Sequence, residues 1–511
     1  MAFAIGCGVV AIVMTLLWKY LGARGKAFQK QYFHDKGRPM GLMEELFRVF
    51  HDVEGRLILA NTLVLRSKKP ITSPVVRKAM ELLMKRHPML RMCTKKDQNG
   101  DYCINKMANA HVDLRELDTT DWRTVMEDNL LETFDGDNGP LWRVTFLPNA
   151  RYEPVTEEDM PGITSYPHEC IFVFAFHHIV VDGPSYARMF AEFMKFVGKL
   201  LNNEEPNVTS MPMLPPLDLY MDEVVQSKWY HHVLQGVLEV LCLIPGFSGF
   251  MMRKIIREEN AFTNKHGVEI QRNSHIQPRT KIIPVEFTKV ETSRLLKMCK
   301  EHKATVQGAA QTAAGVAMVT MLEAKEHEVE SNVTVNIRPF LKSKVPDDYA
   351  GAYFLALQSK NLVALSPDGD KFWSMATQAS DNIHAQLNKK EPIKMWLTMK
   401  CLLPVLIDAF QRKAQDMKPS GRVEQLVVFT NLGYAKFLDK SPEDEVILRA
   451  RFGCSAEHQH GTIFGNNIAT FNGKLFWTVV YFSNIVNDST AKKYADLIKG
   501  TILKAIKDIK D

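Results

Sequence analysis

The sequence predicts an α/β protein with two lobes, and three observations point to this class. The chain has 511 residues, more than one hydrophobic core usually serves, so two domains or lobes are expected. Apolar residues make up 46% and charged residues 24% of the chain, which is typical of a globular protein and not of a disordered or multi-spanning one. Short apolar runs of strand length are mixed with longer helical segments in both halves of the chain.

The first element is an uncharged run at the N-terminus. Residues 2–18 carry no charge, and Lys19, Arg24 and Lys26 follow them. A helix of this length extends about 26 Å, enough for a thin bilayer such as that of the endoplasmic reticulum. Because the positive charge follows the run, the positive-inside rule places the rest of the chain in the cytosol. We expect residues 1–26 to be a single-pass anchor in the endoplasmic reticulum membrane; a cleaved signal peptide is the main alternative.

Residues 40–202 are expected to form the N-terminal lobe. Residues 56–65 predict a strand, and Ser73-Pro74 predicts the start of a helix that ends at His87-Pro88. Two further apolar runs, 141–147 and 171–176, have strand length. Pro184 then begins a helix with apolar residues at helical spacing.

Residues 203–280 are expected to connect the lobes. They begin with a segment rich in proline and polar residues, 203–219. The stretch Val233–Met252 is largely apolar but contains Pro245-Gly246 in its middle, so it is too interrupted to span a membrane. Two interpretations remain open: an element in the membrane interface or a buried helix between the lobes.

Residues 281–511 are expected to form the C-terminal lobe. Its predicted strands are 282–287, 333–337, 426–429, 463–471 and 475–481. Its predicted helices begin near residue 292, cover the alanine-rich stretch 305–322, and close the chain over 489–509.

Composition and missing motifs exclude several function classes. The net charge of +6 is mild and no run of five or six basic residues occurs, so no nucleic-acid partner is expected. Phosphate-binding glycine loops and the Gly-x-Ser-x-Gly elbow are absent, which argues against nucleotide-binding proteins, kinases and serine hydrolases. His458 and His460 would share one face of a strand, but no third ligand is near, so no metal site is expected.

The segment His177-His178-Ile179-Val180-Val181-Asp182-Gly183 is the strongest candidate for chemistry. It follows the apolar run 171–176 and precedes the helix at Pro184, which places His178 on a strand-to-helix turn, where Gly183 would allow the tight backbone geometry. Neutral imidazole is a natural general base near physiological pH. Four fixed residues at this spacing arise by chance about once in a thousand such chains. The alternative is a hydrogen-bonded pair of core histidines.

In this setting the segment resembles the His-His-x-x-x-Asp-Gly motif of the coenzyme-A-dependent acyltransferase superfamily. That superfamily includes chloramphenicol acetyltransferase, alcohol acetyltransferases, wax-ester synthases and condensation domains. Further stretches resemble its motifs in the same order, and the resemblance covers about residues 40–510: Arg86–Arg91, Gly139–Val144 with Leu147-Pro148, and Phe429–Gly433. Asn336–Pro339 with Gly351–Phe354 resembles a second-lobe segment less specifically. Gln307-Gly308 departs from the wax-ester pattern and favours the alcohol acetyltransferase branch.

The resemblance implies two chloramphenicol acetyltransferase-like lobes with a tunnel between them, and it assigns roles to the motif residues. His178 would be the general base at the centre of the tunnel, and His177 would pack the turn. Asp182 would point away and pair with an arginine, for which Arg91 is the candidate. Two residues of the other lobe would lie across the tunnel near the developing oxyanion: Asn431 and Gly433.

The function implied is transfer of an acyl group from acyl-CoA to a lipid-like or small alcohol. Acyl-CoA would be a co-substrate, with no resident cofactor, and the protein would act as a monomer at a membrane. One alternative is a condensation-type enzyme that uses a carrier-bound acyl donor, with an amine as acceptor. The other is an inactive relative that binds a lipid or a partner. The intact His178 argues against the inactive relative, and the lack of a carrier region argues against the condensation-type enzyme.

Overall fold

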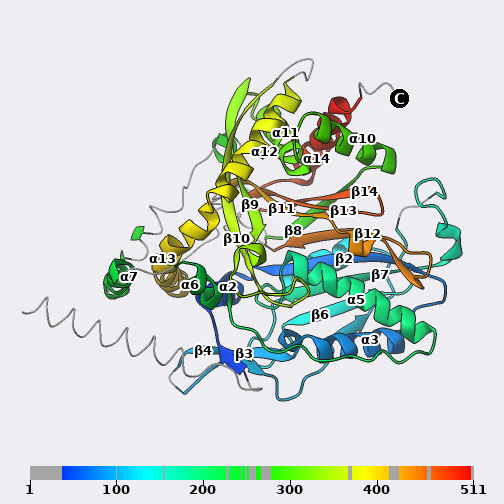
Figure 1. Cartoon of the computed structure of the whole chain (residues 1–511), viewed down its shortest axis with the longest axis horizontal. Helices are drawn as coiled ribbons and strands as arrows, with labels where there is room; N and C mark the ends of the chain where they lie inside the picture. Colours follow the sequence, from blue (N-terminus) through cyan, green and yellow to red (C-terminus); the bar gives the residue numbers. More distant parts are fainter. Residues whose placement is uncertain are drawn as a thin grey trace, which may run out of the picture.

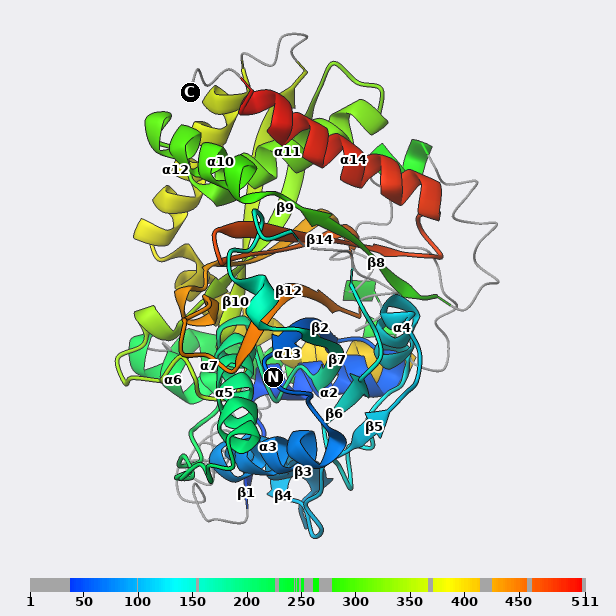
Figure 2. The same cartoon turned by 90° about the vertical axis from the view of Figure 1, so that its right-hand side faces the viewer.

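The computed structural model contains two α/β lobes, stacked so that both sheets lie in the middle of the molecule (Figure 1). It describes residues 37–98, 100–152, 156–225, 229–242, 244, 246–247, 250–251, 261–265, 278–365, 371–413, 425–456 and 462–507. Helices cover the outer side of each sheet, and the two views agree on this arrangement (Figure 2).

The first lobe is built on a five-stranded sheet of order β12-β2-β7-β6-β5. Its strands are β2 (Ile58–Ser67), β5 (Leu114–Glu116), β6 (Trp142–Leu147), β7 (His168–His177) and β12 (Val446–Ser455). Its helices are α3 (Ser73–Arg86), α4 (Trp122–Leu131) and α5 (Gly183–Leu201). Strand β7 is buried over its whole length except at His168, as expected of a central strand. Helix α5 packs on it through phenylalanine pairs such as Phe174 with Phe190, whose ring centroids lie 5.0 Å apart.

The second lobe is built on a six-stranded sheet of order β10-β9-β11-β13-β14-β8. Its strands are β8 (Thr280–Glu286), β9 (Glu326–Asn336), β10 (Phe354–Ala364), β11 (Gln425–Tyr434), β13 (Thr462–Phe471) and β14 (Lys474–Phe482). The outer helices are α10 (Lys289–Glu301), α11 (Val306–Met321), α12 (Phe372–Asn388) and α14 (Asp488–Ala505). The ring of Tyr494 on α14 stacks on Phe464 of β13, which fixes the closing helix to the sheet.

Strand β12 joins the two lobes. It lies between β11 and β13 in the chain, yet it pairs antiparallel with β2, with Phe452 opposite Thr62. Every residue of β12 except Ser455 is buried. The C-terminal part of the chain therefore supplies an edge strand to the first sheet, and this strand was not among the predicted ones.

A group of helices gathers beside the sheets, at the left of Figure 1. Its members are α2 (Leu42–Glu54), α6 (Leu217–Val224), α7 (Trp229–Cys242) and α13 (Glu391–Lys413). Helix α13 contacts both α2 and α7. A separate three-stranded sheet has the order β1-β4-β3. Its strand β1 (Gly37–Pro39) precedes α2 in the chain, and its strands β3 (Met92–Lys96) and β4 (Tyr102–Lys106) follow it.

The prediction of a two-lobed α/β fold is confirmed, and so are most of the predicted strands and helices. The predicted strand at 56–65 corresponds to β2, the alanine-rich helix to α11 and the closing helix to α14. The predicted membrane anchor, residues 1–26, lies outside the described residues. Among the residues that are described, no helix combines the length and apolar character needed to cross a bilayer.

Candidate active site

The turn between β7 and α5 holds His178, as the sequence predicts. Its backbone is fixed from both sides: His178 N donates to Leu57 O at 3.0 Å, and His177 N donates to Leu141 O at 2.9 Å. Leu57 and Leu141 directly precede strands β2 and β6, the two neighbours of β7 in the sheet. The position of His178 is therefore set by three adjacent strands at once.

Asp182 caps the helix that follows. Its Oδ1 accepts from Ser185 N at 3.1 Å and from Ser185 Oγ at 2.7 Å, while Ser185 Oγ accepts from Asp182 N at 3.0 Å. This is a capping box, and Pro184 in the first turn adds a residue whose fixed φ suits a helix start. The local sequence thus determines where α5 begins and in which direction Asp182 points.

Gly183 serves a different purpose from the one expected. It is the first residue of α5 and is not among the glycines with positive φ, so the turn does not need its conformational freedom. A Cβ at this position would lie 3.0 Å from Leu432 Cδ2, on β11 of the other lobe. The glycine therefore permits the two lobes to approach closely beside the His178 turn.

Asp182 binds Arg338, not Arg91, and the predicted pairing with Arg91 is wrong. Arg338 Nη1 lies 2.7 Å from Asp182 Oδ2, and Nη2 lies 3.2 Å from Oδ1, with both side chains almost fully buried. The backbone N–H of Tyr353 donates to the same Oδ2 at 2.9 Å. Arg338 follows β9 and Tyr353 precedes β10, so one carboxylate connects the His178 turn with two segments of the second lobe.

Arg91 instead completes the C-terminal end of α3. Its Nη1 donates to the backbone carbonyl of Met84 and, at 2.6 Å, to that of Lys85, and its Nη2 donates to Ser210 Oγ at 3.2 Å. The last carbonyls of a helix have no partner within it, and a nearby guanidinium satisfies them. The Arg338 and Tyr353 segments are the ones that the sequence associated with a second-lobe motif, but only the structure identifies them as the partners of Asp182.

The imidazole of His178 is held as a neutral base. Its Nδ1 lies 3.1 Å from Val181 O, and a carbonyl can only accept, so Nδ1 carries the proton and Nε2 keeps its lone pair. Burial lowers the pKa of His178, and the opposing effect of the Asp182 carboxylate does not reverse this shift. At neutral pH, Nε2 is therefore ready to accept a proton.

Two phenylalanines from different lobes enclose this imidazole. Phe47 of α2 lies 5.2 Å from it, and Phe354 at the start of β10 lies 4.8 Å from it, both measured between ring centroids. The rings of Phe47 and Phe354 also pack against each other. Such aromatic contacts restrict rotation of the imidazole and exclude water from its faces. The sequence did not predict either phenylalanine as a neighbour of His178, although Phe354 ends the segment Gly351–Phe354 that resembled a second-lobe motif.

His177 has a structural environment. It is buried, its Nδ1 accepts from Ile179 N at 3.2 Å, and its ring centroid lies 4.4 Å from that of His51. Burial lowers the pKa of His177 well below its ordinary value. His51 in turn accepts from Phe134 N and contacts Asp52, so the ring next to His177 is itself held by hydrogen bonds.

Asn431 and Gly433 lie on β11, in the segment that faces Gly183 through Leu432. Asn431 Nδ2 donates to Gln307 Oε1 at 3.1 Å, and Gly433 N donates to Asn431 Oδ1 at 2.8 Å. Gly433 has φ +66°, a conformation that glycine adopts without strain. The Gly433 amide thus fixes Asn431, and Asn431 Nδ2 keeps a second hydrogen for another acceptor. The role of these residues at an oxyanion remains a prediction.

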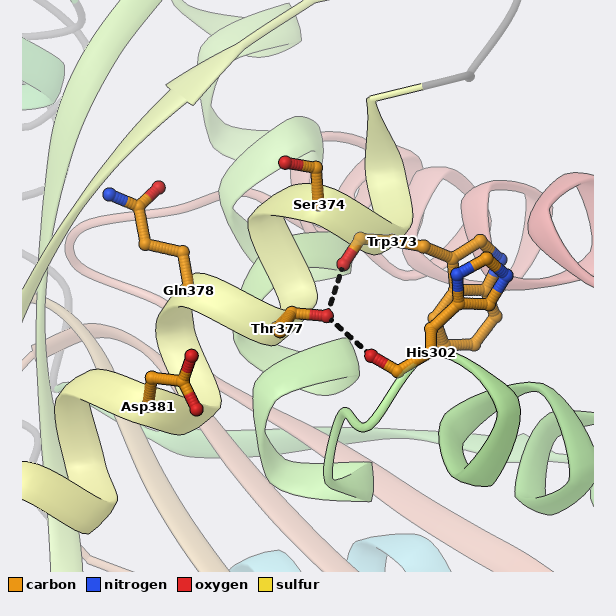
Figure 3. A pocket seen from close by; sticks show the side chains of 6 residues that line it. All are labelled: His302, Trp373, Ser374, Thr377, Gln378 and Asp381. Atoms are coloured by element: carbon orange, nitrogen blue, oxygen red, sulfur yellow. Dashed lines mark hydrogen bonds between the residues drawn. The ribbon is translucent and has the colours of Figure 1, made fainter.

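Two pockets lie elsewhere. One of about 560 Å³ is lined by α12 and the end of α10: His302, Trp373, Ser374, Thr377, Gln378 and Asp381 (Figure 3). Thr377 Oγ1 bonds there only to the backbone carbonyls of His302 and Trp373. Another, of about 810 Å³, follows the side of α5. No residue of the His177–Gly183 motif lines either pocket.

Within the described ranges, no three His, Cys, Asp or Glu side chains come together in an arrangement that could hold a metal ion. His458 and His460 lie outside these ranges.

Comparison with known proteins gives a consistent result. Residues 54–214 match the family model of the condensation domain. Trichothecene 15-O-acetyltransferase from Fusarium sporotrichioides has a similar structure, with 11% identity, 92% of this chain and 95% of that chain covered, and a TM-score of 0.58. Polyketide synthase associated protein 5 from Mycobacterium tuberculosis is similar at 12% identity, with 91% and 97% covered and a TM-score of 0.55.

The first condensation domain of the calcium-dependent antibiotic synthetase, solved in complex with a substrate analogue, is similar at 11% identity. The match covers 92% of this chain and 96% of that chain, with a TM-score of 0.58. At such identities these likenesses establish the fold alone. No curated protein matches the sequence.

Proposed function

We propose that this chain, which matches the condensation-domain model over residues 54–214 and shares its fold with an O-acetyltransferase, transfers an acyl group from acyl-CoA to an alcohol. One observation carries this proposal: the neutral imidazole of His178, whose proton is held on Nδ1 by Val181 O and whose rotation is restricted by Phe47 and Phe354. A fixed, neutral Nε2 is the group that a hydroxyl needs in order to become a nucleophile.

The reaction then proceeds in two steps. Nε2 of His178 takes the proton of the acceptor hydroxyl while the oxygen attacks the thioester carbonyl, forming a C–O bond and placing negative charge on the carbonyl oxygen. The C–S bond then breaks, and the thiolate of coenzyme A receives the proton from the imidazolium. The developing oxyanion needs a donor, and Asn431 Nδ2 is our candidate for it.

The choice of donor and acceptor separates this proposal from its rival. The match to the condensation-domain model also favours a carrier-bound acyl donor with an amine acceptor. A neutral base at His178 would serve both reactions. We favour acyl-CoA and an alcohol because Gln307-Gly308 departs from the wax-ester pattern in the direction of the alcohol acetyltransferase branch.

The test is turnover by the purified full chain with a panel of acyl-CoA donors and lipid-like and small alcohols, with the ester product followed by mass spectrometry. His178→Ala should lower kcat/KM by about two to four orders of magnitude, the usual contribution of a general base. The matched control is His384→Ala, which removes an exposed histidine on α12 and should leave the rate unchanged. Equal rates for His178→Ala and the wild type would remove His178 from the mechanism. Turnover with an acylated carrier protein but with no acyl-CoA would favour the rival reaction.

A further inference from the structure

Helix α7 exposes an apolar face. Tyr230, Leu234, Val237 and Val240 follow one another at spacings of four and three residues, so they lie on one side of the helix. Each of these side chains is between 40% and 49% exposed, and Ile244 just beyond the helix is 52% exposed. Large apolar side chains gathered in this way on a surface mark a site of interaction.

The opposite face of α7 is packed, which shows that the exposed face is not a result of loose docking. Leu238 and Cys242 form a small buried cluster with Cys401 and Val405 of α13. Cys401 Sγ also contacts the carbonyl of His231, at 3.6 Å. The helix is therefore held on α13 with its apolar side outward, at the edge of the molecule in Figure 1.

The charge pattern along the sequence indicates what covers this face. Residues 229–252 contain a single formally charged residue, Glu239, whereas Arg253, Lys254 and Arg257 follow directly, before Glu258 and Glu259. A surface helix that faced water would carry many more charges, and a polar protein partner would find almost no ion pairs here. An apolar stretch bordered by basic residues matches the hydrocarbon edge and the anionic headgroups of a bilayer.

A second stretch of the chain has the same pattern. Residues 2–18 are uncharged, and Lys19, Arg24 and Lys26 follow them. One bilayer would accommodate both stretches, whereas contact with a second copy of the chain would explain only the face of α7. We propose that the exposed apolar face of α7 is a docking surface for a lipid bilayer that carries anionic headgroups.

The test uses the full chain reconstituted in vesicles of phosphatidylcholine and phosphatidylserine with a trace of a photoactivatable phosphatidylcholine. After illumination, peptide mass spectrometry locates the attached lipid. Lipid should be attached within residues 230–250. Val290 and Leu296 on α10 are comparably exposed apolar residues of the other lobe, and they should remain unlabelled. Because labelling needs no turnover, its result is independent of the proposed acyl transfer.

Two sets of variants make the test specific. The double variant Leu234→Glu, Val237→Glu should reduce labelling of α7 at least about tenfold, because carboxylates do not enter hydrocarbon readily. Leu234 and Val237 are 49% and 40% exposed, so the urea midpoint should be unchanged. Leu234→Ser, Val237→Ser provides a milder variant if it is not. Val290→Glu is the matched control and should leave labelling of α7 at its original level.

Three results would overturn the proposal. The first is equal labelling of α7 and α10, and the second is labelling of residues 2–18 alone. The third is a dimer in mild detergent that Leu234→Glu converts to a monomer, which would make the face a contact between copies of the chain.

Discussion

The buried pair between Asp182 and Arg338 leads to a prediction about stability. Asp182→Asn keeps the size of the side chain but removes the charge that faces Arg338. It also replaces one of the two oxygens that accept from Arg338 and from the N–H of Tyr353. Breaking a buried pair by removing one partner costs about 3–5 kcal/mol, because the remaining charge stays buried. The side chains of Asp182 and Arg338 are 1% and 2% exposed, so solvent cannot compensate.

The assay is urea unfolding followed by far-UV circular dichroism and by tryptophan fluorescence, since the two lobes can unfold separately. We expect Asp182→Asn to lower the unfolding midpoint clearly. Arg338→Met should lower the midpoint as well. The double variant should lose much less free energy of unfolding than the two single variants lose together. Arg91→Met serves as the control: it should cost about 1 kcal/mol through its lost hydrogen bonds and should add independently to Asp182→Asn. A variant Asp182→Asn with wild-type stability and no turnover would refute a structural role and assign Asp182 to the chemistry.

Three further outcomes follow from the site. Burial lowers the pKa of His178 below its ordinary value of 6.5. We therefore expect kcat/KM to be level through neutral pH and to fall only in acid, as Nε2 becomes protonated. A loss of kcat/KM that began above neutral pH would contradict this expectation. Phe354→Ala should lower kcat about tenfold, because the imidazole of His178 becomes free to rotate. The free energy of unfolding in urea should fall by about 2 kcal/mol, because this ring is half-buried. An unchanged kcat would show that the ring contact does not contribute to catalysis. Gly183→Ala should lower the free energy of unfolding by about 1 kcal/mol, because its Cβ meets Leu432. In the double variant with Leu432→Ala this added loss should disappear. If the loss remains in the double variant, the close approach of the lobes is not its cause.

The buried His177 makes the free energy of unfolding depend on pH in a defined direction. Burial holds the pKa of His177 well below its ordinary value, so the unfolded chain binds a proton more readily than the folded one. The stability contributed by neutral His177 is complete above about pH 6.5 and is lost as the pH falls below that value. Loss of activity in acid can thus come from protonation of His178 or from unfolding, and reversible recovery on return to neutral pH separates the two.

The sequence alone determined the local part of the site. The apolar run before His177, the cap at Asp182 and the proline after Gly183 act through neighbours a few residues away, so their spacing sufficed to predict a strand, a turn and a helix around His178. The two-lobed α/β class also followed from chain length and the mixture of strands and helices. Strand β12 escaped prediction because Arg449 and Arg451 interrupt its apolar run, and nothing in its sequence indicates that it joins the first sheet.

The tertiary structure decided which distant residues surround the turn. Arg338 lies 156 positions from Asp182 in the chain, and it reaches the carboxylate because the lobes pack face to face. Arg91 is nearer in sequence and was the predicted partner, but the end of α3 binds its guanidinium instead. Phe354 likewise reaches His178 from the other lobe, and Leu432 of that lobe leaves little room for a side chain at Gly183. Local periodicity depends on backbone geometry over a few residues. These contacts depend instead on how whole sheets stack, and the spacing of residues in a short segment cannot predict that.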